Sequence, residues 1–180
     1  MNVEKCVRLA RAGDREALSV LCAHFYPLLQ RFFLKLNLPP ADADDLSQST
    51  LLRMMEKLDS FHFLPGRHFE GWLMRIAYHL FIDLKRKPLP LPLQDDFPLP
   101  DPSPGAEQLL LRKEAVQTVQ RALSLLDPEL QALLSMRYEL DMPYPDIAAA
   151  LDISPVRVKW RLHDALIKLK SIMEKGGFTP

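Results

Sequence analysis

The chain has 180 residues, which is enough for one ordinary domain or two small ones. Apolar residues make up 48% of the chain, which is enough to bury a core, so this composition argues against a globally disordered protein. Lysine plus arginine equals aspartate plus glutamate at 23 each, and the resulting zero net charge argues against a polybasic, histone-like nucleic-acid binder. A local basic face is still compatible with this balance and has to be sought segment by segment.

The cysteines and the N-terminal residues exclude further classes of protein. Cys6 and Cys22 are the only cysteines and form no CxxC pair, which argues against a secreted disulfide scaffold and a zinc finger. The first residues carry charges throughout and lack the apolar segment of a signal peptide. Because no run of 18 apolar residues occurs, we expect a cytoplasmic protein with no membrane insertion.

Proline divides the chain. Seven of the 16 prolines fall between Pro88 and Pro104, where they remove backbone donors and fix φ. This composition predicts a semi-rigid, partly extended linker over residues 88–105. We therefore expect one domain over residues 1–87 and a second over residues 106–180.

Helical patterns dominate the first half. Asp14 is expected to cap a helix whose apolar residues keep helical spacing, and Pro27 is expected to kink or split that helix. A second helix is predicted to start near Ala41, where several aspartates suit the positive end of the helix dipole. A third is predicted over residues 69–87, after an aromatic loop that contains Pro-Gly.

The second half is also predicted to be helical. Asp127 is expected to cap a helix that opens with a proline. A short helix over residues 144–151 is followed by Ser154, which is expected to cap a last helix reaching about Lys175. Two helices joined by a short turn predict a helix-turn-helix. The expected fold is all-α: two small helical domains with the helix-turn-helix in the C-terminal one.

The last predicted helix has an apolar face and a basic face. Val158, Leu162, Ala165, Leu169 and Ile172 form one apolar stripe that we expect to pack on the earlier helices. From residue 157 to residue 175 there are six basic and two acidic residues, so the local charge is +4 in a neutral protein. Residues near the N-terminus of such a helix meet base edges in the major groove, where arginine reads guanine. The alternative is a solvated charged face on a packing helix.

Aromatic and basic residues also gather in the predicted loop over residues 58–69 and along the third helix. This mixture suits single-stranded DNA, whose bases stack on aromatic rings while the backbone follows positive charge. The alternative is that most of these aromatic side chains are core, which we favour for Phe61 and Phe69. The residues in question are Phe61, His62, Phe63, Arg67, His68, Phe69, Tyr78, His79, Lys85, Arg86 and Lys87.

An enzyme is the least favoured class. A metal site at Asp42, Asp44 and Asp45 lacks further ligands nearby in sequence, and His79 with Asp83 at i, i+4 is more simply a local hydrogen bond. No phosphate-binding glycine motif and no catalytic triad context occur. We therefore expect no cofactor, no metal and no catalysis.

Four stretches, in order along the chain, carry a family resemblance: Ala12-Gly13-Asp14 with the helix after it, ADDLSQSTLL at residues 43–52, FEGWLMRIA at residues 69–77, and the helix-turn-helix region over residues 125–169. Together they resemble the extracytoplasmic-function (ECF) group of bacterial RNA polymerase sigma factors. The resemblance implies a protein that binds core RNA polymerase and directs promoter recognition and transcription initiation. It also implies an anti-sigma factor as a partner. A sigma-like regulator that binds DNA or polymerase without initiating is the alternative.

The resemblance further implies roles for individual residues. Those expected to bind core polymerase are Asp44, Asp45, Leu46, Gln48 and Thr50. Those expected to bind and melt the minus-ten element are Phe61, His62, Phe63, Arg67, Trp72, Arg75, His79, Lys85 and Arg86. Those expected to read the minus-thirty-five element are Ser154, Val156, Arg157, Lys159, Trp160 and Arg161.

The sequence departs from the family's usual pattern at several positions. The family usually has Asn in place of His79, Gly in place of Asp152 and Val156, a small residue in place of Trp160 and Arg in place of Asp164. Asp152 can still adopt a turn conformation, because Asp tolerates positive φ better than most residues. Trp160 and Asp164 alter the expected reading face, which predicts changed specificity or a weak reader that needs an activator.

Overall fold

The computed structural model describes residues 2–63, 68–86 and 118–175, and no strand occurs in these ranges. The expected all-α fold with a C-terminal helix-turn-helix is confirmed. Arg67 and the predicted linker over residues 88–105 lie outside the described residues. The N-terminal half contains α1 (Val3–Arg11), α2 (Arg15–Lys35), α3 (Pro40–Lys57), the 3-10 turn η1 (Leu58–Ser60) and α4 (Phe69–Arg86). The C-terminal half contains a helical stretch over residues 118–124, α6 (Pro128–Leu134), the π-helical turn η2 (Ser135–Glu139), α7 (Tyr144–Leu151) and α8 (Pro155–Lys175).

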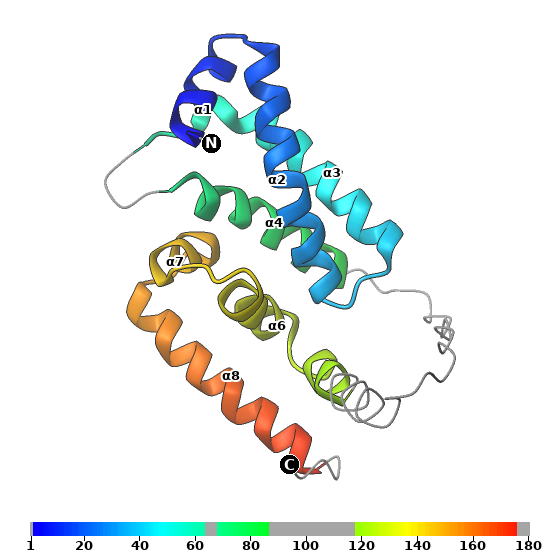
Figure 1. The fold of residues 1–180 in the computed structure, drawn as a ribbon. Coiled ribbons are helices and arrows are strands. Elements are labelled where there is room, and N and C mark those ends of the chain that lie inside the picture. Colours follow the sequence, from blue (N-terminus) through cyan, green and yellow to red (C-terminus); the bar gives the residue numbers. More distant parts are fainter. Residues whose placement is uncertain (1, 64–67, 87–117, 176–180) are drawn as a thin grey trace, which may run out of the picture.

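Helix α2 is the long central helix of the N-terminal half (Figure 1). As expected, the Asp14 carboxylate caps it by accepting hydrogen bonds from the N–H groups of Glu16 and Ala17, at 2.9 and 3.1 Å. The expectation that Pro27 splits this helix is wrong, since α2 runs on to Lys35. Pro27 lies on the exposed side, so the opposite side stays packed and offsets the hydrogen bond that proline cannot make.

By length and composition alone, α2 would also qualify as a membrane-spanning helix, the one such candidate in the part of the chain that the structure describes. Its position gives a simpler account of its apolar character. One side packs into the protein core, through residues that recur at helical spacing. The buried residues of α2 are Ala17, Leu21, Phe25, Leu29, Phe32 and Phe33.

Aromatic side chains form the centre of the N-terminal half. Phe61 and Phe69 are each 1% exposed, with ring centroids 5.2 Å apart in a T-shaped arrangement. Phe25 of α2 packs on Phe69 from the other side at 5.4 Å. The favoured expectation that Phe61 and Phe69 are core residues is therefore confirmed. Burying such rings contributes about 1.5–3 kcal/mol each and fixes where the chain enters α4.

The C-terminal half forms the helix-turn-helix. Helix α7 ends at Asp152, whose backbone is left-handed with φ 57° and ψ 43°, as its tolerance of positive φ allows. The Ser154 hydroxyl accepts a hydrogen bond from the N–H of Arg157 at 3.3 Å and so caps α8. As expected, Asp127 is the N-cap residue of α6 and Pro128 opens that helix. The Asp127 side chain makes no capping hydrogen bond, however, and its carboxylate lies 3.9 Å from Lys168 Nζ.

The two halves pack through α4 and α7, which lie side by side in Figure 1. Gly71 is the point of closest approach. A Cβ added there would lie 3.0 Å from the carbonyl oxygen of Asp146 and 3.3 Å from the Cβ of Ala149. The apolar core is continuous across this contact, since it includes Leu73 of α4 and Ile147 of α7. A residue without a side chain at position 71 is what lets the two helices meet backbone to backbone.

We expect Gly71→Val to destabilise the protein by about 1–3 kcal/mol, because the new side chain meets the α7 backbone and cannot be accommodated without moving it. Thermal unfolding followed by circular dichroism measures the effect. Asp83→Val is the matched control, since it places the same β-branched residue at an exposed position of the same helix. Equal losses in the two variants would contradict the close-contact account.

Candidate nucleic-acid interface

The N-terminal half of α8 presents its outward side to solvent. Val156, Arg157, Lys159 and Trp160 are all exposed, as the helical periodicity predicted. Trp160 is 71% exposed although it is the largest side chain on the helix. The opposite side carries Val158, Leu162 and Ala165, which are buried against the rest of the C-terminal half. The expected reading face is therefore available for contact over the first two turns.

Arg161 lies at the edge of that face. Its Nη2 atom donates to the Glu129 carboxylate of α6 at 2.7 Å, and its side chain is 39% exposed. The same neighbourhood holds Tyr78 of α4, and burial, followed by the nearby Glu129 charge, raises the pKa of the Tyr78 phenol. In this arrangement Arg161 links α8 to α6 and is less free to reach a base than Arg157. Lys159 also has a neighbour, with Nζ 5.6 Å from the centre of the Tyr144 ring.

The aromatic loop before α4 is mostly packed. Phe61 is in the core. The Phe63 ring packs on it in a T-shaped arrangement, with ring centroids 4.8 Å apart, and stays partly exposed. Trp72 is partly buried between Phe61 and Phe69, at 5.1 and 5.2 Å. His62 is exposed, with Nδ1 3.0 Å from the Ser60 carbonyl oxygen. Of the aromatic residues predicted to take a base, Phe63 and Trp72 keep accessible surface and Phe61 does not.

His68 comes just before α4, while Arg75, His79 and Arg86 follow one line along that helix at spacings of four and seven residues. His68 Nδ1 lies 3.1 Å from the carboxylate of the buried Asp146 of α7. Arg75 forms a two-pronged ion pair with Asp152, at 3.1 and 3.4 Å. Arg75 is therefore already engaged across the two halves. Further along α4, His79 and Arg86 are exposed and Lys85 is partly exposed, with its ammonium 5.6 Å from the centre of the Phe81 ring.

A second candidate surface lies on α3. Asp44 accepts hydrogen bonds from the Tyr26 hydroxyl, from Gln30 Nε2 at 3.3 Å and from Gln48 Nε2 at 3.0 Å. The bond to Asp44, together with desolvation, raises the pKa of the Tyr26 phenol. Thr50 is fully buried and donates to the Leu46 carbonyl oxygen at 2.6 Å. Of the residues predicted to bind polymerase, Asp45 and Gln48 are exposed, Leu46 and Asp44 partly so, and Thr50 is not.

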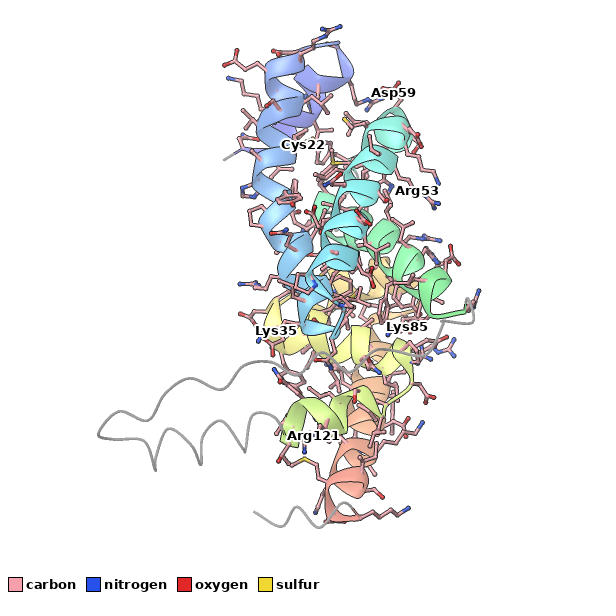
Figure 2. All side chains as sticks on the ribbon, turned by 90° about the vertical axis from the view of Figure 1, so that its right-hand side faces the viewer. Cys22, Lys35, Arg53, Asp59, Lys85 and Arg121 are labelled. Atoms are coloured by element: carbon pink, nitrogen blue, oxygen red, sulfur yellow. The ribbon has the colours of Figure 1, made fainter. Side chains whose placement is uncertain are left out.

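Leu52 completes the outward face of α3 and was missed by the sequence analysis. Leu52 is 56% exposed. Gln48 follows Asp45 by three residues and Leu52 follows Gln48 by four, so the three side chains lie in one line along the helix. The sequence does contain a signal for it, because Leu52 falls outside the buried stripe through Leu51 and Met54. Arg53, the residue after Leu52, is also exposed and projects from α3 in Figure 2.

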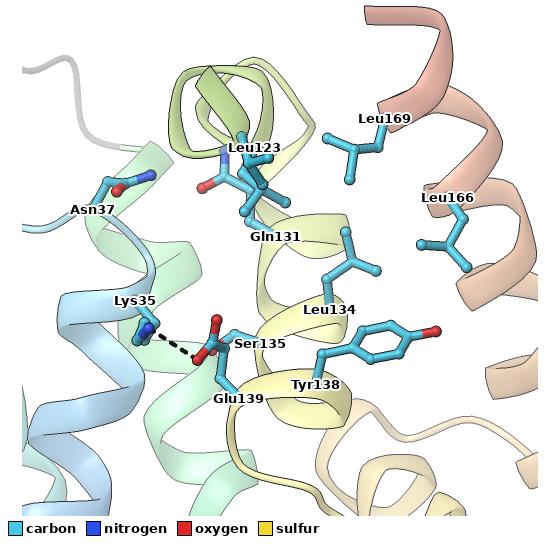
Figure 3. A pocket seen from close by; sticks show the side chains of 11 residues that line it. Lys35, Asn37, Leu123, Gln131, Leu134, Ser135, Tyr138, Glu139, Leu166 and Leu169 are labelled. Carbon is cyan, nitrogen blue, oxygen red and sulfur yellow. Dashed lines mark ion pairs between the residues drawn. The ribbon is translucent and has the colours of Figure 1, made fainter. Parts of the chain in front are cut away.

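An apolar pocket of about 210 Å³ lies in the C-terminal half, where it meets the end of α2. Leu134, Leu166 and Leu169 line it, and Tyr138 closes one side (Figure 3). At its edge Lys35 Nζ forms an ion pair with the Glu139 carboxylate at 3.0 Å. Leu169 belongs to the apolar stripe predicted for the last helix, so the pocket lies against the C-terminal part of that stripe.

The residues of the metal-enzyme alternative, His79 with Asp83 and Asp44 with its neighbours, lie in the described part of the chain. No group of three or more histidine, cysteine, aspartate or glutamate side chains is placed there to hold a metal ion. His79 and Asp83 are exposed on the same helix, and Asp44 is occupied by its three hydrogen-bond donors.

Comparison with known proteins gives the family. The model of sigma-70 region 2 matches residues 21–88, and the model of sigma-70 region 4 matches residues 117–169. The chain belongs to the ECF sigma factors of the sigma-70 family. Proteins of this family act in promoter recognition and transcription initiation, with region 4 in DNA binding. The helix-turn-helix of α7 and α8 lies within the region 4 match, and α3 and α4 lie within the region 2 match.

Curated relatives and solved structures agree with this family. This sigma factor is 29% identical to the ECF sigma factor ShbA of Streptomyces griseus, over 94% of each chain. It is 31% identical to the ECF sigma factor SigE of Mycolicibacterium smegmatis over 74% of its own length, and it spans about half (52%) of that relative. CnrH, solved in complex with the cytosolic domain of CnrY, has a TM-score of 0.70 at 25% identity and covers 94% of this chain and 96% of its own.

A second solved structure supports the fold. It is the sigma factor RpoE in complex with the anti-sigma factor NepR from Bartonella quintana, with a TM-score of 0.62 at 21% identity. The match covers 87% of this chain and 96% of that chain.

We expect Asp44→Asn to move the Tyr26 titration to lower pH, because the neutral amide favours the phenolate more than the carboxylate does. The raised pKa of Tyr26 contributes stability that is fully present below the unfolded value of 10.0 and is lost as pH rises through the folded value. Phenolate absorbance against pH, with Tyr26→Phe to assign the signal, measures the shift. Asp45→Asn is the control, as this neighbouring carboxylate is exposed; an equal shift there would exclude the direct bond as the cause.

Proposed function

We propose that this sigma factor binds core RNA polymerase through the outward face of α3 and reads promoter DNA with α8 and with the exposed side of α4. The observation that carries the proposal is the outward face of α8, a capped, exposed and basic segment of a helix-turn-helix in a protein whose net charge is zero. The sigma factor acts in the cytoplasm and makes no covalent change, and polymerase does the catalysis. Its two promoter-reading units are residues 1–87 and 106–180, joined by residues 88–105.

At the upstream element, α8 enters the major groove. Its outward residues meet base edges, while cations at the sides of the helix contact phosphates and set the position. Of the two arginines predicted to read the upstream element, Arg157 is exposed and Arg161 is held by Glu129. Arg157 is therefore the better placed of the two to bind guanine. Lys159 contacts phosphate, and Ser154 holds the N-terminus of the helix.

At the minus-ten element, the exposed side of α4 holds the melted strand. His79, Lys85 and Arg86 supply the positive charge, and Phe63 with Trp72 supplies the stacking surface. Unpairing costs a few kcal/mol per base, and binding of extruded bases offsets it. Arg75 contributes only when its ion pair with Asp152 is broken, so its contact with DNA requires α7 to move from α4.

An anti-sigma factor is a further partner. This proposal is supported by the solved relative RpoE, whose structure contains the anti-sigma factor NepR. The alternative function, a sigma-like regulator that binds without initiating, is favoured by one observation: Asp164 places a carboxylate on the exposed side of α8. Lys168 Nζ lies 3.3 Å from that carboxylate and offsets its repulsion of phosphate, which favours the initiating sigma factor.

Run-off transcription tests the function. Purified bacterial core polymerase is supplied with a library of promoter fragments, with and without this protein. We expect new, specific start sites only when the protein is present. Binding to core polymerase without any new transcript would overturn initiation and leave the non-initiating regulator.

We expect Leu52→Asp to weaken binding to core polymerase at least tenfold, about 1.4 kcal/mol or more, because a charge replaces an apolar contact in the middle of the α3 face. Titration of labelled protein with core polymerase measures the affinity. The control is Val20→Asp, which makes the same kind of change at an exposed apolar position of α2. Similar losses in both variants would show that the α3 face is not the site.

A further inference from the structure

Two apolar side chains stand at the centre of the outward face of α8. Val156 is 63% exposed and Trp160 71% exposed, and they are four residues apart, so they lie one above the other on the helix. The buried side chains Val158, Leu162 and Ala165 occupy the opposite side. The pair therefore points directly away from the core, along the direction in which such a helix enters the major groove.

Charge surrounds this apolar pair. Arg157 and Lys159 are exposed on either side of it, and the Ser154 cap marks the positive end of the helix dipole just before it. The ligand that complements the pair is apolar at its centre and anionic at its edges. In the major groove, the 5-methyl group of thymine is such an apolar centre, and the phosphates line both edges.

We propose that Val156 and Trp160 read thymine 5-methyl groups in the upstream promoter element and so determine its sequence. This inference rests on the proposed function and adds a specificity to it. Contact is confined to the first two turns of α8, because Asp164 follows Trp160 by one turn and is partnered by Lys168. The recognised element therefore contains thymine where the Trp160 indole lies, beside the base pair that Arg157 reads.

A protein partner is the competing occupant of an exposed apolar pair. The flanking cations favour DNA, since phosphates complement them on both sides of the helix. Ile167 provides an internal comparison. It is also exposed, at 55%, and lies on the same line two turns further along, but beyond Asp164. A protein surface laid along this line would use Ile167 as well, whereas the proposed methyl contact does not.

The experiment uses holoenzyme assembled from core polymerase and the full chain. Upstream elements are selected from a promoter library in which that element is randomised, and start sites are scored by run-off transcription. In the selected promoter each thymine of the upstream element is then replaced by uracil. Uracil keeps every hydrogen-bonding group of thymine and lacks only the 5-methyl group, so it isolates the apolar contact.

We expect the selection to enrich thymine, and one uracil substitution to reduce wild-type promoter binding roughly fourfold, the equivalent of about 0.8 kcal/mol for a buried methyl group. Trp160→Ala holoenzyme should bind more weakly and show no uracil effect at that position. Ile167→Ala, the matched control, should retain the full effect. Because both residues are exposed, neither variant should lower the thermal unfolding midpoint, which is checked in parallel.

Several outcomes overturn the proposal. A selected element without thymine, or wild-type binding that is indifferent to uracil, removes the methyl contact while leaving the sigma function intact. A uracil effect that persists in Trp160→Ala assigns the contact to another residue. Loss of core or partner binding in both Trp160→Ala and Ile167→Ala, with an unchanged promoter preference, assigns the face to a protein. Absence of any specific transcript with wild-type protein overturns the proposed function itself.

Discussion

The approach of α4 to α7 at Gly71 governs how the two halves of the molecule meet. Because a Cβ at this position would lie 3.0 Å from the Asp146 carbonyl oxygen and 3.3 Å from the Cβ of Ala149, any residue other than glycine requires the neighbouring atoms of α7 to shift. The contact of His68 with Asp146 and the ion pair of Arg75 with Asp152, at the end of α7, depend on that separation. So does the continuity of the apolar core, which removes from water surface that two separate domains would each expose.

Features set by local sequence could be predicted, and features set by tertiary contacts could not. The caps at Asp14 and Ser154 follow from residue type and position, and both are present. Pro27 was judged by its local cost alone, but packing of the far side of α2 offsets that cost. Asp127 occupies the predicted N-cap position of α6, yet its carboxylate makes no capping bond and lies near Lys168, a residue 41 positions away that no local pattern relates to it.

The candidate sites divide in the same way. Helical periodicity was sufficient to place Trp160 outward and Val158 inward on α8. It could not show that Arg161 is tied to Glu129, because that ion pair depends on how α6 packs against α8. On α3 the motif over residues 43–52 contains both residues, but the predicted contact set included Thr50, which is buried, and omitted Leu52, which is exposed. A sequence motif contains both buried structural residues and exposed residues that can contact a partner, and the structure is needed to tell the two kinds apart.

Asp152 has two structural roles, one through its backbone and one through its side chain. Its left-handed backbone ends α7, where glycine would remove about 1 kcal/mol of steric cost. Its carboxylate holds Arg75 of α4, and an exposed ion pair of this kind contributes about 0.2–1 kcal/mol. The two contributions have opposite signs, so the ion pair offsets part of the steric cost. Aspartate also fixes an orientation: the turn before α8 is joined to α4, so the direction of α8 is coupled to that of the helix proposed to bind the minus-ten element.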